Sequence, residues 1–466
     1  MIAPARVAAY EILTAVSRGR DLPAAIASAR TGLGDDRDRA LASEIATGVQ
    51  RWRAALDHVI ARLSDRTIER LDPQILEILR LSAYQLLHLT RVPASAVVDD
   101  GVNLARRAGK RSATGFVNGV LRAVSRRRQA LPLPPRPDDS RNRDAVLAYF
   151  TITLSHPRWL AARWYDRLGF DAAEAWLRFN NQPGPVTLRA NRIRTTRHAL
   201  AARLAATDVR VRPGDFAPDA LIVEAGHPLR GSQRTPRGGA ANQGDRLEEG
   251  AFLVQDEASQ LVPLLASPRR GARVLDTCAA PGGKTTAMAA AMECRGLLVA
   301  CDVRTRRIDL LRKTIAAMGA RNVRVVQADL SKSLPFHAPF DTVLVDVPCS
   351  GLGTLRRDPD IRWRRREDDL PRFAAAELTM LQHAAEIVGP NGRLVYATCS
   401  SEPEENEDVV SAFLASARGF TTLHARDAAP ELPAAVVDTR GHLRTEPHRH
   451  GLEAFFGAVF ERVVDR

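Results

Sequence analysis

The first part of the chain alternates apolar and polar positions with the period of an α-helix. Apolar side chains recur three or four residues apart in Arg6–Leu13, Ala40–Leu63 and Pro73–Leu89, which predicts amphipathic helices. The pair Asp72 and Pro73 is typical of a helix start, with an N-cap followed by proline at the first helical position. We therefore expect an all-α domain over residues 1–130.

A proline-rich stretch over residues 131–144 interrupts this pattern and reads as a linker. Residues 145–262 then contain both helix-like and strand-like patterns: Asp171–Asn180 predicts a helix, and Val186–Asn191 predicts a strand. Residues 231–248 are polar and rich in turn formers, so we expect a surface loop there. Residues 145–262 as a whole predict a small α+β connecting domain.

From residue 263 onward, short apolar runs alternate with helical stretches. Most of these runs end in aspartate; they are Val274–Asp276, Leu297–Asp302, Val323–Asp329, Thr342–Asp346 and Gly392–Tyr396. Such alternation is typical of βαβ units in a parallel, doubly wound sheet. We therefore predict a Rossmann-like α/β domain over residues 263–466, and ligands of such sheets bind at the carboxyl ends of the strands.

The composition is that of an ordinary globular protein, with 466 residues, 45% apolar and 26% charged. There is no apolar run of about 18 residues and no signal-like N-terminus, so we expect a cytoplasmic protein without a membrane partner. The five cysteines are odd in number and form no CxxC pair. This argues against a disulfide framework and a metal site.

The charge favours a polyanionic partner. The formal net charge is +13, with 63 Arg and 4 Lys, and residues 1–137 hold 22 basic against 13 acidic side chains. A basic domain joined to a catalytic one indicates binding to nucleic acid, although a merely solvated basic surface is the alternative.

A glycine turn follows the first strand of the α/β domain, at Ala280-Pro-Gly-Gly-Lys284. Glycines permit close backbone approach, and a helix N-terminus offers free N–H groups to a carboxylate. The spacing is neither that of a Walker loop nor GxGxxG. Asp302 is placed to bind ribose hydroxyls and Asp329 to accept from an exocyclic amine. These residues predict bound adenosine, and S-adenosylmethionine fits, although strand-end aspartates can also simply cap helices.

Two cysteines, Cys349 and Cys399, each follow an apolar strand near the predicted ligand. Carbon 5 of cytosine is a poor nucleophile, and a thiolate that adds to carbon 6 activates it for methylation. Such a thiolate needs a lowered pKa, and the residues alone leave open which cysteine attacks. Asp346 could hold the edge of the base, and Lys284 could contact the cofactor carboxylate or assist at the base.

Basic side chains crowd the segment after Cys349. They are Arg356, Arg357, Arg362, Arg364, Arg365 and Arg366. This cluster could bind phosphates, although Asp358 and Arg362 more simply order the loop.

The segments Asp276–Thr286, Asp346–Trp363 and Thr398–Asn406 resemble the Fmu/Sun family of RNA 5-methylcytosine methyltransferases. The resemblance implies that Cys399 is the nucleophile and that Cys349 assists product release. It implies cofactor contacts at Cys278, Ala279, Ala280, Pro281, Gly282, Gly283, Lys284, Asp302, Arg307, Asp329 and Asp346.

The N-terminal segments Arg37–Arg39, Gly48–Arg51, Leu79–Leu86 and Gly115–Arg122 are similar to NusB-type RNA-binding domains. The layout resembles the bacterial small-subunit ribosomal RNA enzymes of the family, which implies methylation of a cytosine of 16S ribosomal RNA. We expect a monomer. Three alternatives remain: a transfer RNA substrate, a non-catalytic NusB-like RNA-binding or antitermination protein, and a DNA cytosine methyltransferase. The last would use Cys349 as the nucleophile.

Overall fold

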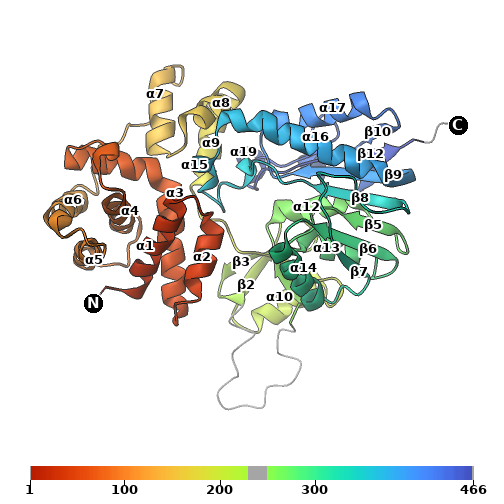
Figure 1. The fold of residues 1–466 in the computed structure, drawn as a ribbon, viewed down its shortest axis with the longest axis horizontal. Coiled ribbons are helices and arrows are strands. Elements are labelled where there is room, and N and C mark those ends of the chain that lie inside the picture. Colours follow the sequence, from red (N-terminus) through yellow and green to blue (C-terminus); the bar gives the residue numbers. More distant parts are fainter. Residues whose placement is uncertain (1, 229–248, 464–466) are drawn as a thin grey trace, which may run out of the picture. The chain divides into compact units, whose positions relative to one another are not determined.

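The computed structural model describes residues 2–228 and 249–463 (Figure 1), so the predicted loop 231–248 lies outside the described residues. Tertiary contacts divide the chain into two compact units. Unit 1 comprises residues 1–183 and a later segment, 355–367, whereas unit 2 comprises residues 184–354 and 368–466. Unit 1 therefore includes a piece of chain from inside the α/β sequence.

Unit 1 is helical, which confirms the predicted all-α N-terminal domain. Its helices are α1 (Pro4–Ser17), α2 (Leu22–Arg30), α3 (Asp36–Ser64), α4 (Pro73–His88), α5 (Ala94–Arg107), α6 (Thr114–Arg126), α7 (Arg143–Ala148), α8 (Arg158–Leu168), α9 (Phe170–Asn180) and α15 (Ile361–Arg364). Asp72 caps α4 as expected, because its carboxylate accepts from the N–H groups of Gln74 and Ile75. The apolar faces of α1 to α6 share one buried core, which includes Leu13 and Ile45.

Unit 2 contains two sheets. The smaller has the order β2-β3-β1-β4 and is antiparallel at each pairing. Its strands are β1 (Thr187–Ala190), β2 (Arg210–Pro213), β3 (Ala220–Ala225) and β4 (Phe252–Val254), with helix α10 (Arg197–Ala205) packed on them. This arrangement confirms the predicted α+β fold of the connecting region, whereas residues 145–183 of the predicted range belong to unit 1.

The larger sheet has the order β10-β12-β9-β8-β5-β6-β7, with β11 paired to β12. Its strands are β5 (Arg273–Asp276), β6 (Leu297–Asp302), β7 (Val323–Gln327), β8 (Phe340–Asp346), β9 (Val388–Thr398), β10 (Phe420–Leu423), β11 (Leu443–Arg444) and β12 (Phe456–Arg462). The strands from β9 to β7 are parallel, as predicted. In contrast, β12 and β10 are antiparallel additions that the sequence pattern did not reveal.

Helices cover both faces of this sheet (Figure 1). The helices α12 (Glu257–Ala266), α13 (Gly283–Ala291) and α14 (Thr305–Met318) lie on one face, and α16 (Leu370–Glu386) and α17 (Glu407–Ser416) lie on the other. Successive strand residues point to opposite faces, so Leu344 joins the first core while Val343 and Val345 join the second. The short helices α18 (Ala425–Ala428) and α19 (Pro447–His450) complete the unit.

Helix α3 is kinked at Trp52, whose φ of −107° and ψ of 16° are not helical. In a regular helix the carbonyl of Gln50 would accept from the N–H of Ala54. Instead, the Trp363 indole donates to the Gln50 carbonyl at 2.6 Å, and the N–H of Ala54 donates to Ser155 Oγ at 2.9 Å. The segment 355–367 is thus fitted to the kink.

Arg362, from the same segment, is completely buried in unit 1. Its guanidinium donates to the carbonyls of Ser155 (3.1 Å) and Asn180 (3.3 Å), and to Oδ1 of Asn181 (2.9 Å). Burial and the charge of Arg51 lower its pKa to about 9. Arg362 is therefore a bonding centre for backbone carbonyls, which agrees with its predicted role in ordering the loop, and its buried guanidinium is not available to the phosphates that the predicted basic cluster could bind.

Replacing Arg362 with Met should destabilise unit 1, because buried carbonyl groups would lose their donor. Each unsatisfied buried acceptor costs about 1–3 kcal/mol, so we expect a loss of roughly 2–4 kcal/mol in the free energy of unfolding. Urea denaturation measures this loss, and hydrogen exchange in α3 and α9 locates it. The matched variant Arg364→Met removes a half-exposed side chain that pairs with Asp360 and should cost less than about 1 kcal/mol. Equal losses in the two variants would contradict the prediction.

Candidate active site

The two cysteines predicted to act together are adjacent in space. Strands β8 and β9 pair in parallel with Asp346 opposite Ala397, so the loops that follow them leave the same edge of the sheet. Cys349 Sγ lies 3.0 Å from Cys399 Sγ, and the backbone N–H of Cys399 lies 3.3 Å from Cys349 Sγ. The pairing of these strands thus brings together two cysteines that are fifty residues apart in the sequence.

The two thiols are not electrostatically equivalent. The hydrogen bond with Cys399 raises the pKa of Cys349 well above its ordinary value, and burial and the nearby carboxyl groups of Glu405 and Glu377 add to this effect. Cys349 is therefore held as a protonated thiol that can donate to the sulfur of Cys399. The other thiol interacts with a cation: Cys399 contributes to the raised pKa of Lys284.

Lys284 and Asp346 form an ion pair at the edge of the sheet. Lys284 Nζ lies 2.6 Å from Asp346 Oδ2, and the ammonium lies 5.8 Å from the centre of the Phe455 ring. Burial would lower the pKa of Lys284, but the carboxylate of Asp346 outweighs it and the pKa is raised. Lys284 therefore stays cationic beside the thiols.

The glycine turn leads into α13, with Gly282 at a φ of +106°, a conformation that favours glycine. A buried cation fastens this turn to the neighbouring sheet. Arg189, on β1, donates to Gln255 Oε1 at 2.6 Å, to Thr286 Oγ1 at 2.7 Å, and to the carbonyl of Gly283. Burial lowers the pKa of Arg189 to about 10. Sequence analysis missed this residue, although a charge inside the short apolar strand Thr187–Ala190 was a signal.

A cavity of about 130 Å³ opens beside the turn. It is lined by Leu253, Val254, Gln255, Ser259, Asp276, Cys278, Ala279, Ala280, Pro281, Gly283, Lys284 and Asp346. The predicted contacts from Cys278 to Lys284 therefore meet Asp346 at one place, apart from Gly282, which lies within the turn but outside the lining. Burial raises the pKa of Cys278, so this thiol stays protonated.

Asp276 lines the cavity and is a buried hydrogen-bond acceptor. Its Oδ2 accepts from Thr285 Oγ1 at 2.7 Å, whereas its buried Oδ1 has no hydrogen-bond partner among the described residues. Burial raises the pKa of Asp276 to about 7. S-adenosylmethionine carries cationic and N–H groups. It therefore fits a carboxylate with few hydrogen-bond donors around it, next to the backbone of the glycine turn.

The remaining predicted contacts lie outside the cavity lining. Asp302 ends β6 as predicted, is buried, and accepts from the N–H of Arg304 (3.3 Å) and from Arg307 Nη1 (3.5 Å). Asp329 lies two residues beyond the end of β7, and its carboxylate accepts from the N–H and hydroxyl of Ser331. Asp302 is thus oriented by its own loop, and Asp329 caps a turn.

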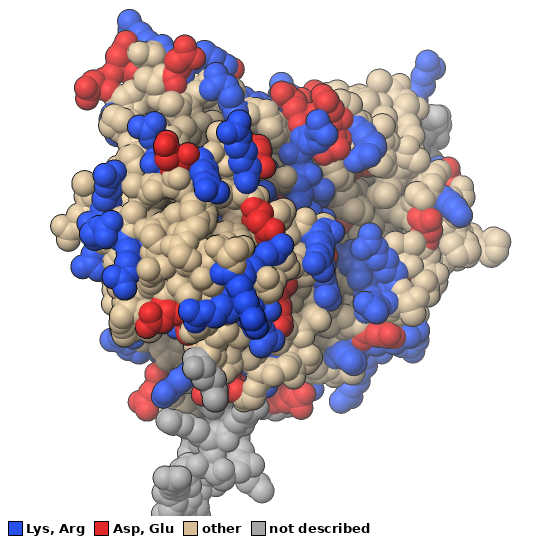
Figure 2. All heavy atoms as spheres, turned by 60° about the vertical axis from the view of Figure 1, so that its left-hand side comes forward, with Lys and Arg blue, Asp and Glu red and all other residues tan. Residues whose placement is uncertain are grey.

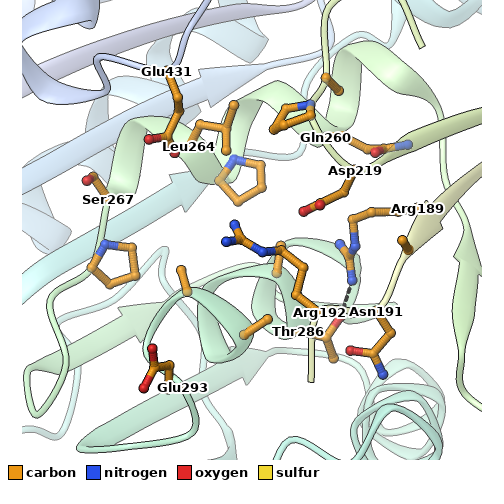
Figure 3. Close-up of a pocket in the computed structure, with 18 residues that line it drawn as sticks. Arg189, Asn191, Arg192, Asp219, Gln260, Leu264, Ser267, Thr286, Glu293 and Glu431 are labelled. Atoms are coloured by element: carbon orange, nitrogen blue, oxygen red, sulfur yellow. Dashed lines mark hydrogen bonds between the residues drawn. The ribbon is translucent and has the colours of Figure 1, made fainter. Parts of the chain in front are cut away.

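A separate cavity of about 380 Å³ lies behind α13 (Figure 3). The guanidinium of Arg192 projects into it toward the carboxylate of Asp219, and Arg189 and Thr286 stand at one side. Neither the cysteines nor the strand-end aspartates line this cavity. This cavity is therefore separate from the candidate site and lies beside residues that hold the glycine turn.

Metal-ligand clusters and membrane-spanning helices are both absent from the described residues. Across residues 2–228 and 249–463, no group of three or more His, Cys, Asp or Glu side chains could hold a metal ion. In the same described part of the chain, no helix is long and apolar enough to cross a membrane.

The fold and the site define a methyltransferase-type α/β domain joined to a NusB-type helical domain and a ferredoxin-like domain. Sequence comparison agrees: the 16S rRNA methyltransferase RsmB/F family matches residues 263–461, the NusB family matches residues 3–126, and the RsmF/B-like ferredoxin-like domain matches residues 156–230.

Whole-chain relatives are similar over nearly their full length. The ribosomal RNA small subunit methyltransferase B of Pseudomonas putida is 32% identical over 424 residues, covering 90% of each chain. That of Proteus mirabilis is 30% identical and covers 88% of this chain and 91% of the relative. The chain therefore belongs to the ribosomal RNA small subunit methyltransferase B family.

Solved structures share the fold. The crystal structure of PH0851 superimposes with a TM-score of 0.78 at 24% identity and covers 99% of each chain. The structure of NSun6 from Pyrococcus horikoshii with SFG gives a TM-score of 0.56 at 20% identity and covers 66% of this chain and 99% of the other.

The buried carboxyl group of Asp276 predicts a pH dependence of stability. Its pKa of about 7 exceeds the value of about 3.9 in an unfolded chain. The folded protein thus keeps a proton that the unfolded chain has lost, so this contribution to stability disappears as pH rises through 7. Asp276→Asn cannot titrate, and its free energy of unfolding relative to wild type should rise between pH 5 and pH 8 by roughly 2–4 kcal/mol.

Urea unfolding from pH 5 to pH 8 tests this expectation on the protein without ligand. The control is Asp427→Asn, which makes the same chemical change at an exposed position. Parallel curves for wild type and Asp276→Asn would show that Asp276 is ionised throughout this range.

Proposed function

We propose that this protein methylates carbon 5 of a cytosine in 16S ribosomal RNA, with S-adenosylmethionine as the methyl donor. The observation that carries the proposal is the pair of thiols, Cys349 and Cys399, 3.0 Å apart beside the ion pair of Lys284 and Asp346. Membership of the ribosomal RNA small subunit methyltransferase B family supports both the reaction class and the RNA substrate.

The cofactor would lie against the glycine turn, held by Asp276 and the backbone from Cys278 to Gly283, with Asp302 available for ribose hydroxyls. When bound there, S-adenosylmethionine supplies an electrophilic methyl group. Arg189 contributes indirectly, because it binds the carbonyl of Gly283 and so fixes the turn. Asp346 would accept a hydrogen bond from the exocyclic amine of the cytosine.

Cys399 is the nucleophile in this proposal. Its thiolate forms a bond to carbon 6 of the cytosine, and the displaced electron pair makes carbon 5 nucleophilic. Carbon 5 then takes the methyl group. Loss of the proton from carbon 5 and departure of the Cys399 thiolate restore the double bond between carbons 5 and 6.

Cys349 would take the proton from carbon 5. Its largest pKa-raising contact is the hydrogen bond with Cys399, and that contact changes once the Cys399 sulfur is bonded to carbon 6. The pKa of Cys349 should then fall, so the thiol can release its own proton to water and, as the thiolate, take the proton from carbon 5. The raised pKa thus delays ionisation of Cys349 until Cys399 has attacked.

RNA binding by unit 1 would rest on charge. Arginines are exposed on α5 and α6, including Arg106, Arg122 and Arg126, and Figure 2 shows Lys and Arg side chains spread across one face of the molecule. Such side chains bind phosphates without reading sequence. The target cytosine must also leave its stack to reach Cys399.

Methyl transfer from labelled S-adenosylmethionine tests the proposal directly, with 16S ribosomal RNA, 23S ribosomal RNA and transfer RNA as separate substrates. We expect 5-methylcytosine, identified by mass, in 16S ribosomal RNA alone. The same base in transfer RNA alone would keep the chemistry and overturn the substrate. If neither naked RNA nor small-subunit particles are methylated, the enzymatic proposal is wrong.

Cys349→Ala should accumulate a covalent protein–RNA adduct, because Cys399 can still attack carbon 6 while release is slowed. A band of reduced mobility on a denaturing gel, dependent on S-adenosylmethionine and removed by nuclease, measures the adduct.

The double variant Cys349→Ala, Cys399→Ala is the matched control and should form no adduct. Cys399→Ala alone should lose methyl transfer while keeping cofactor affinity. Rapid turnover by Cys349→Ala without any adduct would contradict the release role, and activity in Cys399→Ala would contradict the nucleophile assignment.

A further inference from the structure

One buried carboxylate bonds to both cysteine loops. Glu405 lies in the short turn Pro403–Glu405 after β9 and is completely buried. Its Oε1 accepts from the backbone N–H of Ser350 at 2.6 Å, and its Oε2 accepts from the hydroxyl of Ser350 at 2.6 Å and from the hydroxyl of Ser400. These two serines directly follow Cys349 and Cys399.

The two serines are themselves buried and in contact. Ser350 Oγ lies 3.3 Å from Ser400 Oγ, and neither side chain is more than 2% exposed. Each cysteine is therefore one peptide unit away from an atom bound by Glu405. In contrast, the two hydrogen bonds of the neighbouring Asn406 side chain both go to the Cys399 loop, at Thr398 Oγ1 and at the carbonyl of Ser400.

We propose that Glu405 is a positioning residue that sets the separation and orientation of the two thiols by holding Ser350 and Ser400 together. It touches neither reacting sulfur and acts through the loops that carry them. The proposal deepens the proposed function, because thiols that attack and then release one base need a fixed spacing. A misplacement of about 1 Å at a reacting centre costs on the order of 100-fold in rate.

A second buried carboxyl group, Glu377 on α16, supports this role. Burial and the charge of Glu405 raise the pKa of Glu377 to about 10, so Glu377 keeps its proton at neutral pH. The Tyr396 hydroxyl lies 3.0 Å from Glu377 Oε2 and 2.6 Å from the carbonyl of Glu405. With Glu377 neutral, no second buried charge opposes the three hydrogen bonds that the cysteine loops donate to Glu405.

The spacing of the thiols can be measured without RNA or cofactor. Diamide oxidises two nearby thiols to a disulfide and is itself reduced to the hydrazine, so the rate at which Cys349 and Cys399 form a disulfide reports their separation. Mass spectrometry of the linked peptides gives this rate. We expect Glu405→Ala to lower it at least 10-fold, with cofactor affinity unchanged.

Variants that remove different numbers of the Glu405 hydrogen bonds distinguish a positioning role of Glu405 from a general loss of stability. Glu405→Gln should restore most of the rate, because its amide oxygen can accept from the Ser350 N–H while its NH2 donates to the serine hydroxyls, which rotate. Asp408→Asn, an exposed change in the same segment, should match wild type. If Glu405→Ala fails to fold, the double variant Ser350→Ala, Ser400→Ala replaces it and should also slow disulfide formation.

A folded Glu405→Ala, or the folded double serine variant, that forms the disulfide at the wild-type rate would overturn the proposal. Single-turnover methyl transfer provides the link to chemistry and should fall about 100-fold in Glu405→Ala. Because the oxidation assay involves no substrate, it can succeed even if the proposed methylation is wrong. Failure of the two ideas is therefore distinguishable.

Discussion

The parallel register of β8 and β9 is the constraint on which the candidate site depends. Asp346 pairs with Ala397, and the N–H of Val347 extends the ladder to the carbonyl of Ala397 at 3.1 Å. A slip of one residue would turn every side chain of the strand to the other face, so the two cores of the sheet fix this register. The thiols meet because their loops begin at adjacent points on this edge.

Buried ionisable side chains hold three irregular backbone segments of this structure. Arg189 binds the carbonyl of Gly283 in the glycine turn, Arg362 binds carbonyls around the kink in α3, and Glu405 binds an N–H group and two hydroxyls between the cysteine loops. A buried ion is costly unless hydrogen bonds surround it. This cost favours one backbone conformation at each of these three residues, because a loop in another conformation would leave the buried charge unpaired.

The sequence predicted the elements better than the contacts between them. Periodicity located α3 and the strands ending at Asp276 and Asp346, because one buried face imposes a period of 3.6 or 2. The kink at Trp52 has no periodic signal, since it depends on Trp363 and Arg362 from more than 300 residues later. The cysteines were recognisable by their chemistry, whereas the bond from Glu405 to Ser350 follows only from the folded loops.

The asymmetry between the two thiols has a physical origin in their neighbours. Carboxyl groups of Glu405 and Glu377 contribute to the raised pKa of Cys349, whereas the ammonium of Lys284 interacts with Cys399. Two thiols 3.0 Å apart cannot both be ionised at low cost, so ionisation of either thiol opposes ionisation of the other. The proposed mechanism uses this opposition, because Cys349 acts as a base only after the Cys399 sulfur has bonded to carbon 6 of the cytosine.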